Sequence, residues 1–111
     1  MIGLRHGKVG TVLLNKEHKS NMLSEPFMED VRRSLEAMEI DEDIRVVVMM
    51  TNKKQVFSMG TDLNYLYYRK NAGEIDKIVE YFQKLYNFQN FMANYHKPLL
   101  AVGNGIISKI N

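Results

Sequence analysis

The side chains that could act as nucleophiles, bases or metal ligands are few and scattered in this sequence. Its three histidines, His6, His18 and His96, lie far apart along the chain, and no serine or cysteine motif accompanies them. Nucleophilic catalysis needs such partners within hydrogen-bond reach, so no histidine is indicated as catalytic. Cysteine is absent, which excludes disulfides and thiolate chemistry. Histidine, aspartate and glutamate nowhere cluster with the spacing of a metal site.

Two other groups of residues could bind a ligand or do chemistry, and each has a structural alternative. Asp62 could be a catalyst, but its place at the start of a predicted helix favours a helix cap. The run of residues 65–70 (Y-L-Y-Y-R-K) could form a phosphate-binding or partner surface. Packing combined with a solvated edge explains the same run more simply. The eight methionines fit the filling of a core better than a methionine-based site.

Length and composition limit the class of protein. The chain has 111 residues, enough for one small domain. Hydrophobic residues make up 45% and charged residues 25%, a globular balance that argues against disorder. A net charge of +2, without an arginine-rich stripe, gives no indication of nucleic acid. Residues 46–50, the longest apolar run, are far shorter than the roughly 20 residues that cross a bilayer. Residues 1–8 do not resemble a secretory signal or a transit peptide.

The first elements that must position any site are a strand and a helix. Residues 9–14 are apolar and rich in β-branched side chains, which predicts a strand. Ser24 and Pro26 predict a helix start, with a hydroxyl cap and an early proline. Apolar residues at spacings of three and four then predict one buried face. The residues of this face are Phe27, Met28, Val31, Leu35 and Met38.

The middle of the chain predicts a second strand and a short helix. Residues 44–50 are apolar on both faces beyond Arg45, which is typical of a parallel-sheet strand covered on both sides. Residues 51–55 form a polar loop. A tight turn then opens a short helix at residues 62–66.

A long helix is predicted from about residue 74 to 94, after a break at residues 71–73. Its expected buried positions are Ile75, Ile78, Val79, Phe82, Leu85, Phe88 and Met92. His96 is expected to end this helix, where a partly positive ring is favoured. Pro98 cannot continue it, and residues 99–102 predict a third strand. The order strand, helix, strand, helices, strand predicts the α/β class with a parallel sheet.

Four short motifs follow one another along the chain. Residues 12–15 (V-L-L-N) and 19–23 (K-S-N-M-L) form the first, and residues 44–48 (I-R-V-V-V) form the second. Residues 56–63 (V-F-S-M-G-T-D-L) form the third, and residues 97–105 (K-P-L-L-A-V-G-N-G) form the fourth. Together they resemble the enoyl-CoA hydratase/isomerase (crotonase) family, which writes the last two approximately as A-F-S-A-G-x-D-L and K-P-x-I-A-A-V-N-G. Each motif alone is weak, but the four in order make the resemblance strong.

This resemblance implies a fold and a ligand. The fold is crotonase-like, a spiral of strand–helix units with a mostly parallel sheet, of which residues 1–111 would form an incomplete domain. The ligand is an acyl-CoA thioester, whose oxygen accepts hydrogen bonds from two fixed backbone N–H groups as enolate-like charge develops. By resemblance, Thr61 supplies the first N–H group. The residues expected along the coenzyme A path are Asn21, Met22, Ser58, Met59, Gly60 and Asp62.

The sequence departs from the family pattern after Gly105. The family continues N-G-x-x-x-G-G-G and takes its second N–H donor from the glycines, whereas Lys109 and Ile110 stand at two of those positions. A β-branched residue such as Ile110 disfavours the tight glycine backbone. The catalytic glutamates of the hydratases would fall beyond Asn111, so the acid/base pair that adds water is not among these residues.

Two functions are therefore considered. In the first, the chain is a truncated, catalytically inactive crotonase-like subunit of a larger assembly. Partner chains, identical or different, would cover its open sheet edge and apolar faces. In the alternative, it is part of an enoyl-CoA hydratase or isomerase of fatty-acid β-oxidation whose remaining half lies elsewhere. A truncated gene product with non-native residues after Gly105 is a third explanation. The family resemblance implies the mitochondrial matrix.

Overall fold

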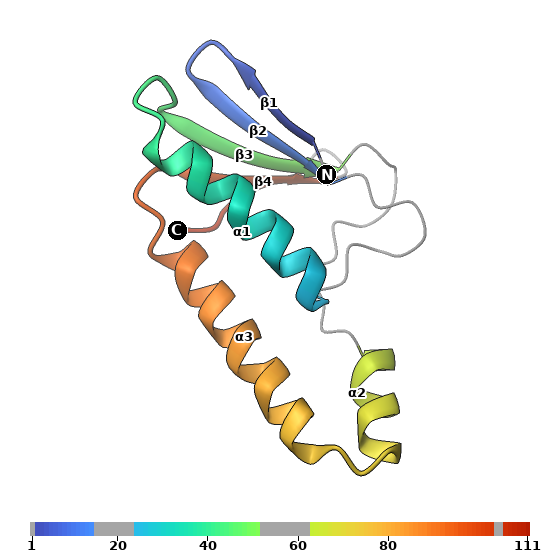
Figure 1. The fold of residues 1–111 in the computed structure, drawn as a ribbon. Coiled ribbons are helices and arrows are strands. Elements are labelled where there is room, and N and C mark those ends of the chain that lie inside the picture. Colours follow the sequence, from blue (N-terminus) through green and yellow to red (C-terminus); the bar gives the residue numbers. More distant parts are fainter. Residues whose placement is uncertain (1, 15–23, 52–62, 104–105) are drawn as a thin grey trace.

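Residues 2–14, 24–51, 63–103 and 106–111 are described by the computed structural model of this chain (Figure 1). Within these ranges, five strands form one sheet, with helices packed against it and beyond it. In chain order the elements are β1 (Ile2–His6), β2 (Val9–Leu14), α1 (Glu25–Ile40), β3 (Val46–Thr51), α2 (Leu63–Asn71), α3 (Ile75–Ala93), β4 (Leu99–Gly103) and β5 (Ile106–Lys109). Figure 1 shows α1 and α3 on one side of the sheet, with α2 beside the far end of α3.

The sheet is mixed, and its strands lie side by side in chain order from β1 to β5. The pairs β2–β3 and β3–β4 are parallel, which confirms the parallel arrangement predicted for the three central strands. The pairs β1–β2 and β4–β5 are antiparallel, and the two outer strands were not predicted. Both lie at the edges of the sheet, where even their apolar residues Leu4 and Ile107 are 52% and 67% exposed. Edge strands are held mainly by backbone hydrogen bonds, so they leave little apolar pattern to read.

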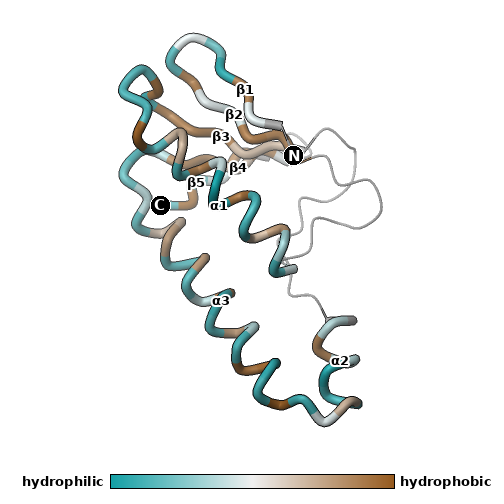
Figure 2. Tube along the Cα trace, in the orientation of Figure 1, coloured by the Kyte–Doolittle hydropathy of each residue, from teal (hydrophilic) through white to brown (hydrophobic). Residues whose placement is uncertain are grey.

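One face of the sheet is buried under the helices. Val12 of β2, Val47 and Met49 of β3 and Leu99 of β4 are each 0% exposed. The side chains that alternate with them on β3 are only half-buried. Among the described residues, α1 and α3 lie on the same side of the sheet, so the prediction that this strand is covered on both faces is not confirmed (Figure 1). Hydropathy shows the same layering, with central strands largely brown and helices alternating brown and teal (Figure 2).

α1 forms as predicted, from its cap to its buried face. The Oγ atom of Ser24 accepts a hydrogen bond from the backbone N–H of Phe27 at 3.3 Å, and Pro26 occupies the first turn. This cap satisfies a backbone donor that the helix itself leaves unpaired. All five apolar residues expected on the inner face are buried. The prediction of this helix is confirmed.

α3 forms in the predicted place, but three of the seven positions predicted to be buried are exposed, and Ile78 is partly buried. Leu85, Phe88 and Met92 are buried as expected. Ile75, Val79 and Phe82 are instead 62%, 52% and 46% exposed. The face that packs inward is the one that carries Tyr81, Leu85, Phe88 and Met92. The helix thus has two apolar stripes, and only one of them faces the core.

Three consecutive residues after α3, at positions 95–97, form hydrogen bonds with the C-terminal part of α1. The hydroxyl group of Tyr95 donates a hydrogen bond to the backbone oxygen of Leu35. The ammonium group of Lys97 donates to the backbone oxygens of Met38 and Asp41, both at 2.6 Å. The last carbonyl groups of a helix have no partner within it and carry partial negative charge. The lysine of the K-P motif therefore acts here as a cap for a helix far away in sequence.

His96, between these two residues, is bound to α1 as well. Its backbone N–H donates to the Glu39 carboxylate at 2.9 Å, and its ring Nδ1 lies 2.9 Å from the same oxygen. The expectation that His96 serves the end of the long helix is corrected, because its partner belongs to α1. Burial raises the pKa of the Glu39 carboxyl, but the His96 hydrogen bonds and the His96 and Lys97 charges outweigh it and lower the pKa.

The last residue of the chain joins the same region. The Asn111 side-chain oxygen accepts from the backbone N–H of Leu99 at 3.0 Å. Its amide group donates to the backbone oxygens of Tyr95, at 3.0 Å, and Lys97, at 2.5 Å. The backbone N–H of Ile110 donates to the Leu99 oxygen at 2.9 Å. β5 and the residues after it therefore fix the entry into β4.

The close approach of α1 to β2 depends on Gly10. A Cβ atom at Gly10 would lie 2.9 Å from the Met38 sulfur and 3.1 Å from Ile44 Cδ1. We expect Gly10→Val to lower the free energy of unfolding by about 1–3 kcal/mol, because overpacking shifts the helix. Urea unfolding measures this difference.

Gly3→Ala is the matched control, since its Cβ atom would lie 3.5 Å from Met38 Cε, an ordinary contact. We expect no loss of stability from this control. Equal destabilisation by Gly10→Val and Gly3→Ala would contradict the role given to Gly10.

The Glu39–His96 pair makes stability depend on pH. The folded-state pKa of Glu39 is lowered, so its contribution is present above the ordinary glutamate pKa and disappears as pH falls through the folded-state value. We expect Glu39→Gln to lower the unfolding free energy by up to about 1 kcal/mol at neutral pH, with the difference shrinking as pH falls below the ordinary glutamate pKa. Unfolding curves across this range measure it.

Glu36→Gln provides the control, since Glu36 pairs with Arg32 on the exposed side of the same helix. The interpretation fails if Glu39→Gln and the wild type differ by the same amount at every pH.

Candidate functional site

The carboxyl ends of the three parallel strands lie together at one edge of the sheet. In the pairing register, Leu14 of β2 is opposite Thr51 of β3, and Met50 of β3 is opposite Val102 of β4. Ligands of open α/β sheets bind outside this edge. β2, β3 and β4, the strands that precede residues 15–23, 52–62 and 104–105 in the chain, all end at this edge. Strand ends that are far apart in sequence thus lie side by side.

The site residues predicted from the sequence lie outside the described residues. They are Asn21, Met22, Ser58, Met59, Gly60, Thr61 and Asp62. The structure fixes the strand ends that precede them and the starts of α1 and α2 that follow them. It does not bring the seven residues together or separate them, so their roles stay predictions.

The region where the resemblance expects glycines forms an extended strand. Lys109 pairs with Leu100 in the antiparallel β4–β5 ladder. The backbone N–H of Ile110 is already bound to the Leu99 oxygen at 2.9 Å. A second oxyanion donor needs an N–H group aimed at the ligand. The amide of Ile110 is committed to the sheet instead.

A small cavity of about 170 Å³ lies where the starts of α1 and α2 meet α3. Its lining residues are Ser24, Glu25, Pro26, Tyr65, Arg69 and Tyr81. Tyr81 is 0% exposed, and its ring centroid lies 5.5 Å from that of Tyr65. The sequence interpretation missed Tyr81, although its spacing to Leu85 and Phe88 matches the inner stripe of α3. This tyrosine pair joins α2 to α3.

The run of tyrosine and basic residues in α2 (65–70) is partly packed against the domain and partly exposed to solvent. Tyr67 and Tyr68 are 68% and 65% exposed. The Arg69 guanidinium lies 2.7 Å from the Glu74 carboxylate and 5.2 Å from the centroid of Tyr65. The hydrogen bond to Glu74, followed by that to Tyr65, raises the pKa of Arg69 above its ordinary value. Because this cation already has a carboxylate partner, a phosphate site here gains no support.

Other site classes find no support in the described part of the chain. Among residues 2–14, 24–51, 63–103 and 106–111, histidine, aspartate and glutamate form no group of three that could hold a metal ion. His6 lies on β1, and the ring Nδ1 of His96 contacts the Glu39 carboxylate. None of the described helices is both long and apolar enough to span a membrane.

Comparison with known proteins decides the family. The sequence profile of the enoyl-CoA hydratase/isomerase family matches residues 9–107. The chain belongs to this family. The match begins at β2 and runs into β5, so it includes all three parallel strands and all three helices.

Relatives in this family are much longer than the chain. Small ribosomal subunit protein mS47 of Arabidopsis thaliana is 30% identical over 99 residues, which cover 89% of this chain and 24% of that protein. The 3-hydroxyisobutyryl-CoA hydrolase-like protein 1, mitochondrial, of Arabidopsis thaliana is 31% identical over 86% of this chain and 24% of its own length. The mitochondrial 3-hydroxyisobutyryl-CoA hydrolase of Danio rerio is 26% identical, over 90% and 26%. The chain therefore spans about a quarter of these relatives.

Solved structures establish the fold. Human enoyl-CoA hydratase domain-containing protein 3 superposes with a TM-score of 0.77 at 21% identity, over 94% of this chain and 40% of that one. The enoyl-CoA hydratase of Bacillus anthracis gives 0.75 at 22% identity, over 92% and 38%. The predicted crotonase-like fold is confirmed, and the chain covers only part of it.

The tyrosine contact between α2 and α3 yields a stability prediction. We expect Tyr81→Ala to lower the free energy of unfolding by about 3–5 kcal/mol, because a fully buried aromatic ring leaves a cavity. Tyr67→Ala is the control, since Tyr67 is 68% exposed, and it should change stability by less than about 0.5 kcal/mol. Thermal unfolding followed by circular dichroism measures both, and similar melting temperatures for the two variants would contradict the assignment.

Proposed function

We propose that this crotonase-like chain acts as an accessory subunit of a larger protein assembly. The observation that carries the proposal is the outer stripe of α3, defined as Ile75, Val79, Phe82 and Tyr86. These four side chains are between 46% and 69% exposed. Contiguous exposed apolar surface marks a protein interface or an aggregation hazard. A partner that covers this stripe removes the risk of aggregation.

The relatives add two further supports. One of them bears the name of a ribosomal subunit protein, so within this family the fold occurs in a protein named for its place in an assembly. Two others are named as mitochondrial hydrolases or hydrolase-like proteins. We therefore propose a mitochondrial location for this chain as well.

Four of the described glutamates pair with basic side chains of the same domain. These pairs are Glu25–Lys84, Glu36–Arg32, Glu39–His96 and Glu74–Arg69. A general acid or base needs a carboxyl free to exchange its proton with the substrate. These pairs stabilise helices and their contacts instead.

A second function is favoured by the common edge at which the parallel strands end. β2 and β3, the strands that precede residues 15–23 and 52–62, end side by side at this edge, which suits a wall of an acyl-CoA site. In this function, Thr61 supplies a backbone N–H group to the thioester oxygen. Asn21, Met22, Ser58, Met59, Gly60 and Asp62 line the coenzyme A path. The remaining catalytic groups come from other residues, in an enoyl-CoA hydratase or isomerase.

Native mass spectrometry of the particle isolated from its source distinguishes these functions. We expect this chain in a heteromeric or homomeric assembly at fixed stoichiometry, without hydration of an enoyl-CoA by the isolated particle. Absorbance loss of the conjugated thioester measures that activity. An intact mass well above that of 111 residues, combined with turnover of enoyl-CoA, would overturn the accessory role in favour of the enzyme.

A further inference from the structure

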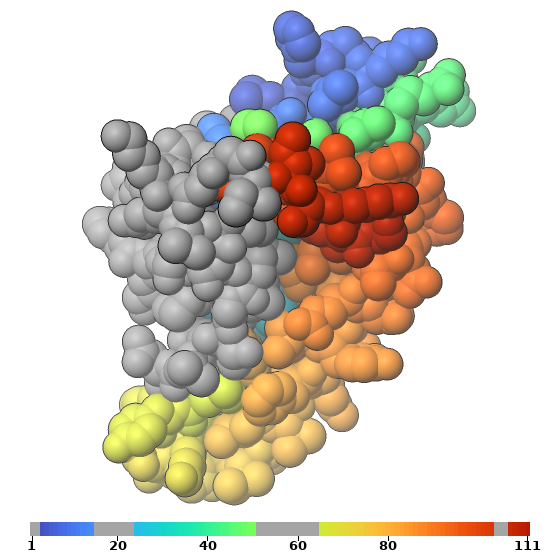
Figure 3. All heavy atoms as spheres, turned by 180° about the vertical axis from the view of Figure 1, so that it is seen from behind, coloured from blue at the N-terminus to red at the C-terminus, as the bar shows by residue number. Residues whose placement is uncertain are grey.

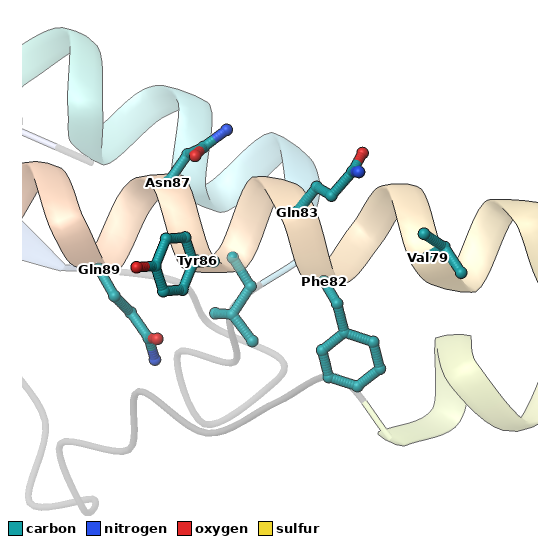
Figure 4. A pocket seen from close by; sticks show the side chains of 7 residues that line it. Val79, Phe82, Gln83, Tyr86, Asn87 and Gln89 are labelled. Atoms are coloured by element: carbon teal, nitrogen blue, oxygen red, sulfur yellow. The ribbon is translucent and has the colours of Figure 1, made fainter.

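The outer stripe of α3 is a single continuous side of the helix. Its residues follow one another at spacings of four, three and four, which places them along one side of a 3.6-residue turn. Val79, Phe82 and Tyr86 line an open groove of about 720 Å³. Figure 4 shows the rings of Phe82 and Tyr86 extending to the same side of the helix. From behind, α3 forms an orange surface band between yellow α2 and the red terminal strands (Figure 3).

The stripe itself carries no charge, and apart from Asp76 on its flank the charged side chains of α3 are turned away from it. Lys77, Glu80 and Lys84 lie on the opposite side, where Glu80 is 3.8 Å from Lys77 and 3.5 Å from Lys84. The polar neighbours of the stripe within the groove are the amides Gln83, Asn87 and Gln89. Aromatic residues without charge are typical of the centre of a protein interface. A nucleic acid or an anionic membrane would instead need lysine and arginine here.

We propose that this stripe is an interface with a second copy of the chain, in which the two α3 helices run antiparallel. The spacing of four, three and four reads the same in both directions. A two-fold axis between residues 80 and 81 therefore places Ile75 opposite Tyr86 of the second copy. The same axis places Val79 opposite Phe82 of the second copy. An isologous interface requires this self-complementarity.

Side-chain size selects the antiparallel arrangement. One half of the stripe is aliphatic, with Ile75 and Val79, and the other half is aromatic, with Phe82 and Tyr86. Antiparallel helices place an aromatic ring against a smaller aliphatic side chain along the whole contact. Parallel helices would face ring against ring at one end and leave the aliphatic end less filled. Facing large and small side chains gives the denser packing.

The residues that flank the stripe are also complementary between the two copies in the antiparallel arrangement. Asp76 and Gln83 occupy equivalent positions beside it, seven residues apart. About the two-fold axis, Asp76 of each copy lies beside Gln83 of the other. An amide can donate a hydrogen bond to a carboxylate, so no like charges meet. Since α3 alone forms the contact, it is smaller than the roughly 800 Å² per partner of a standard interface, and we expect a dissociation constant on the order of 10 µM or weaker.

This inference rests on the proposed accessory role and names one partner in the assembly. Sedimentation velocity of the full chain, at concentrations from about 1 to 500 µM, tests it. We expect a shift from monomer to dimer with rising concentration. Phe82→Ser and Val79→Ser should each weaken the dimer about tenfold or more. Val79→Ser is included because Phe82 also contacts the buried Tyr81, at a centroid distance of 5.6 Å.

Glu80→Gln is the control variant, since it lies at the centre of the same helix on the charged side. It should change the dissociation constant by less than about twofold. Thermal melting of each variant at low concentration checks that the monomer remains folded. Equal dimerisation by wild type and both stripe variants would overturn the interface.

Cross-linking tests the direction of the helices. The chain has no cysteine, so Asp76→Cys and Gln83→Cys each introduce a single thiol. We expect a short bismaleimide to join a mixture of the two variants more efficiently than either variant alone. Equal or better cross-linking of the single variants would overturn the antiparallel arrangement.

The outcomes separate this inference from the proposed function. A monomer at every concentration, with the chain still found in a heteromeric particle, overturns the second-copy interface and leaves the accessory role standing. A dimer that is lost in the stripe variants supports the interface. If that dimer also turned over enoyl-CoA, the interface would stand and the accessory role would fail.

Discussion

The arrangement of this domain depends on how the C-terminal end of α1 is satisfied. A helix leaves its last carbonyl groups without partners, and here Lys97 donates to the backbone oxygens of Met38 and Asp41 at this end. Tyr95 adds a hydrogen bond to the Leu35 oxygen, one turn further into the helix. Glu39 binds the residue between them. Because these three residues also connect α3 to β4, the capping of one helix sets the point at which the third parallel strand enters the sheet. The ends of β2, β3 and β4 meet at one edge because these strands pair in parallel.

The two apolar stripes of α3 differ in burial. The inner stripe, with Tyr81, Leu85, Phe88 and Met92, packs into the domain. The outer stripe remains exposed, although its residues are as apolar as those inside. We propose that a second copy of the chain covers it.

The sequence predicted the elements that bury a continuous apolar pattern. The strand at Val9–Leu14, the capped helix α1 and the strand at Leu99–Gly103 all have one side that must leave water. The outer strands β1 and β5 escaped prediction because backbone pairing, rather than side-chain burial, holds them. The candidate site was predicted as seven residues of two motifs, and the structure describes the strand ends that present these motifs but not the residues themselves.

The sequence by itself determined the family, the parallel arrangement of the central strands and the amphipathic character of α1, because motifs and local periodicity are properties of neighbouring residues. The tertiary structure decided which stripe of α3 faces inward and which helix Lys97 and His96 serve. It also turned residues 106–111 into a strand and its anchor, where the family pattern expects glycines. These features depend on contacts between residues some 12 to 60 positions apart, and no local pattern records such contacts.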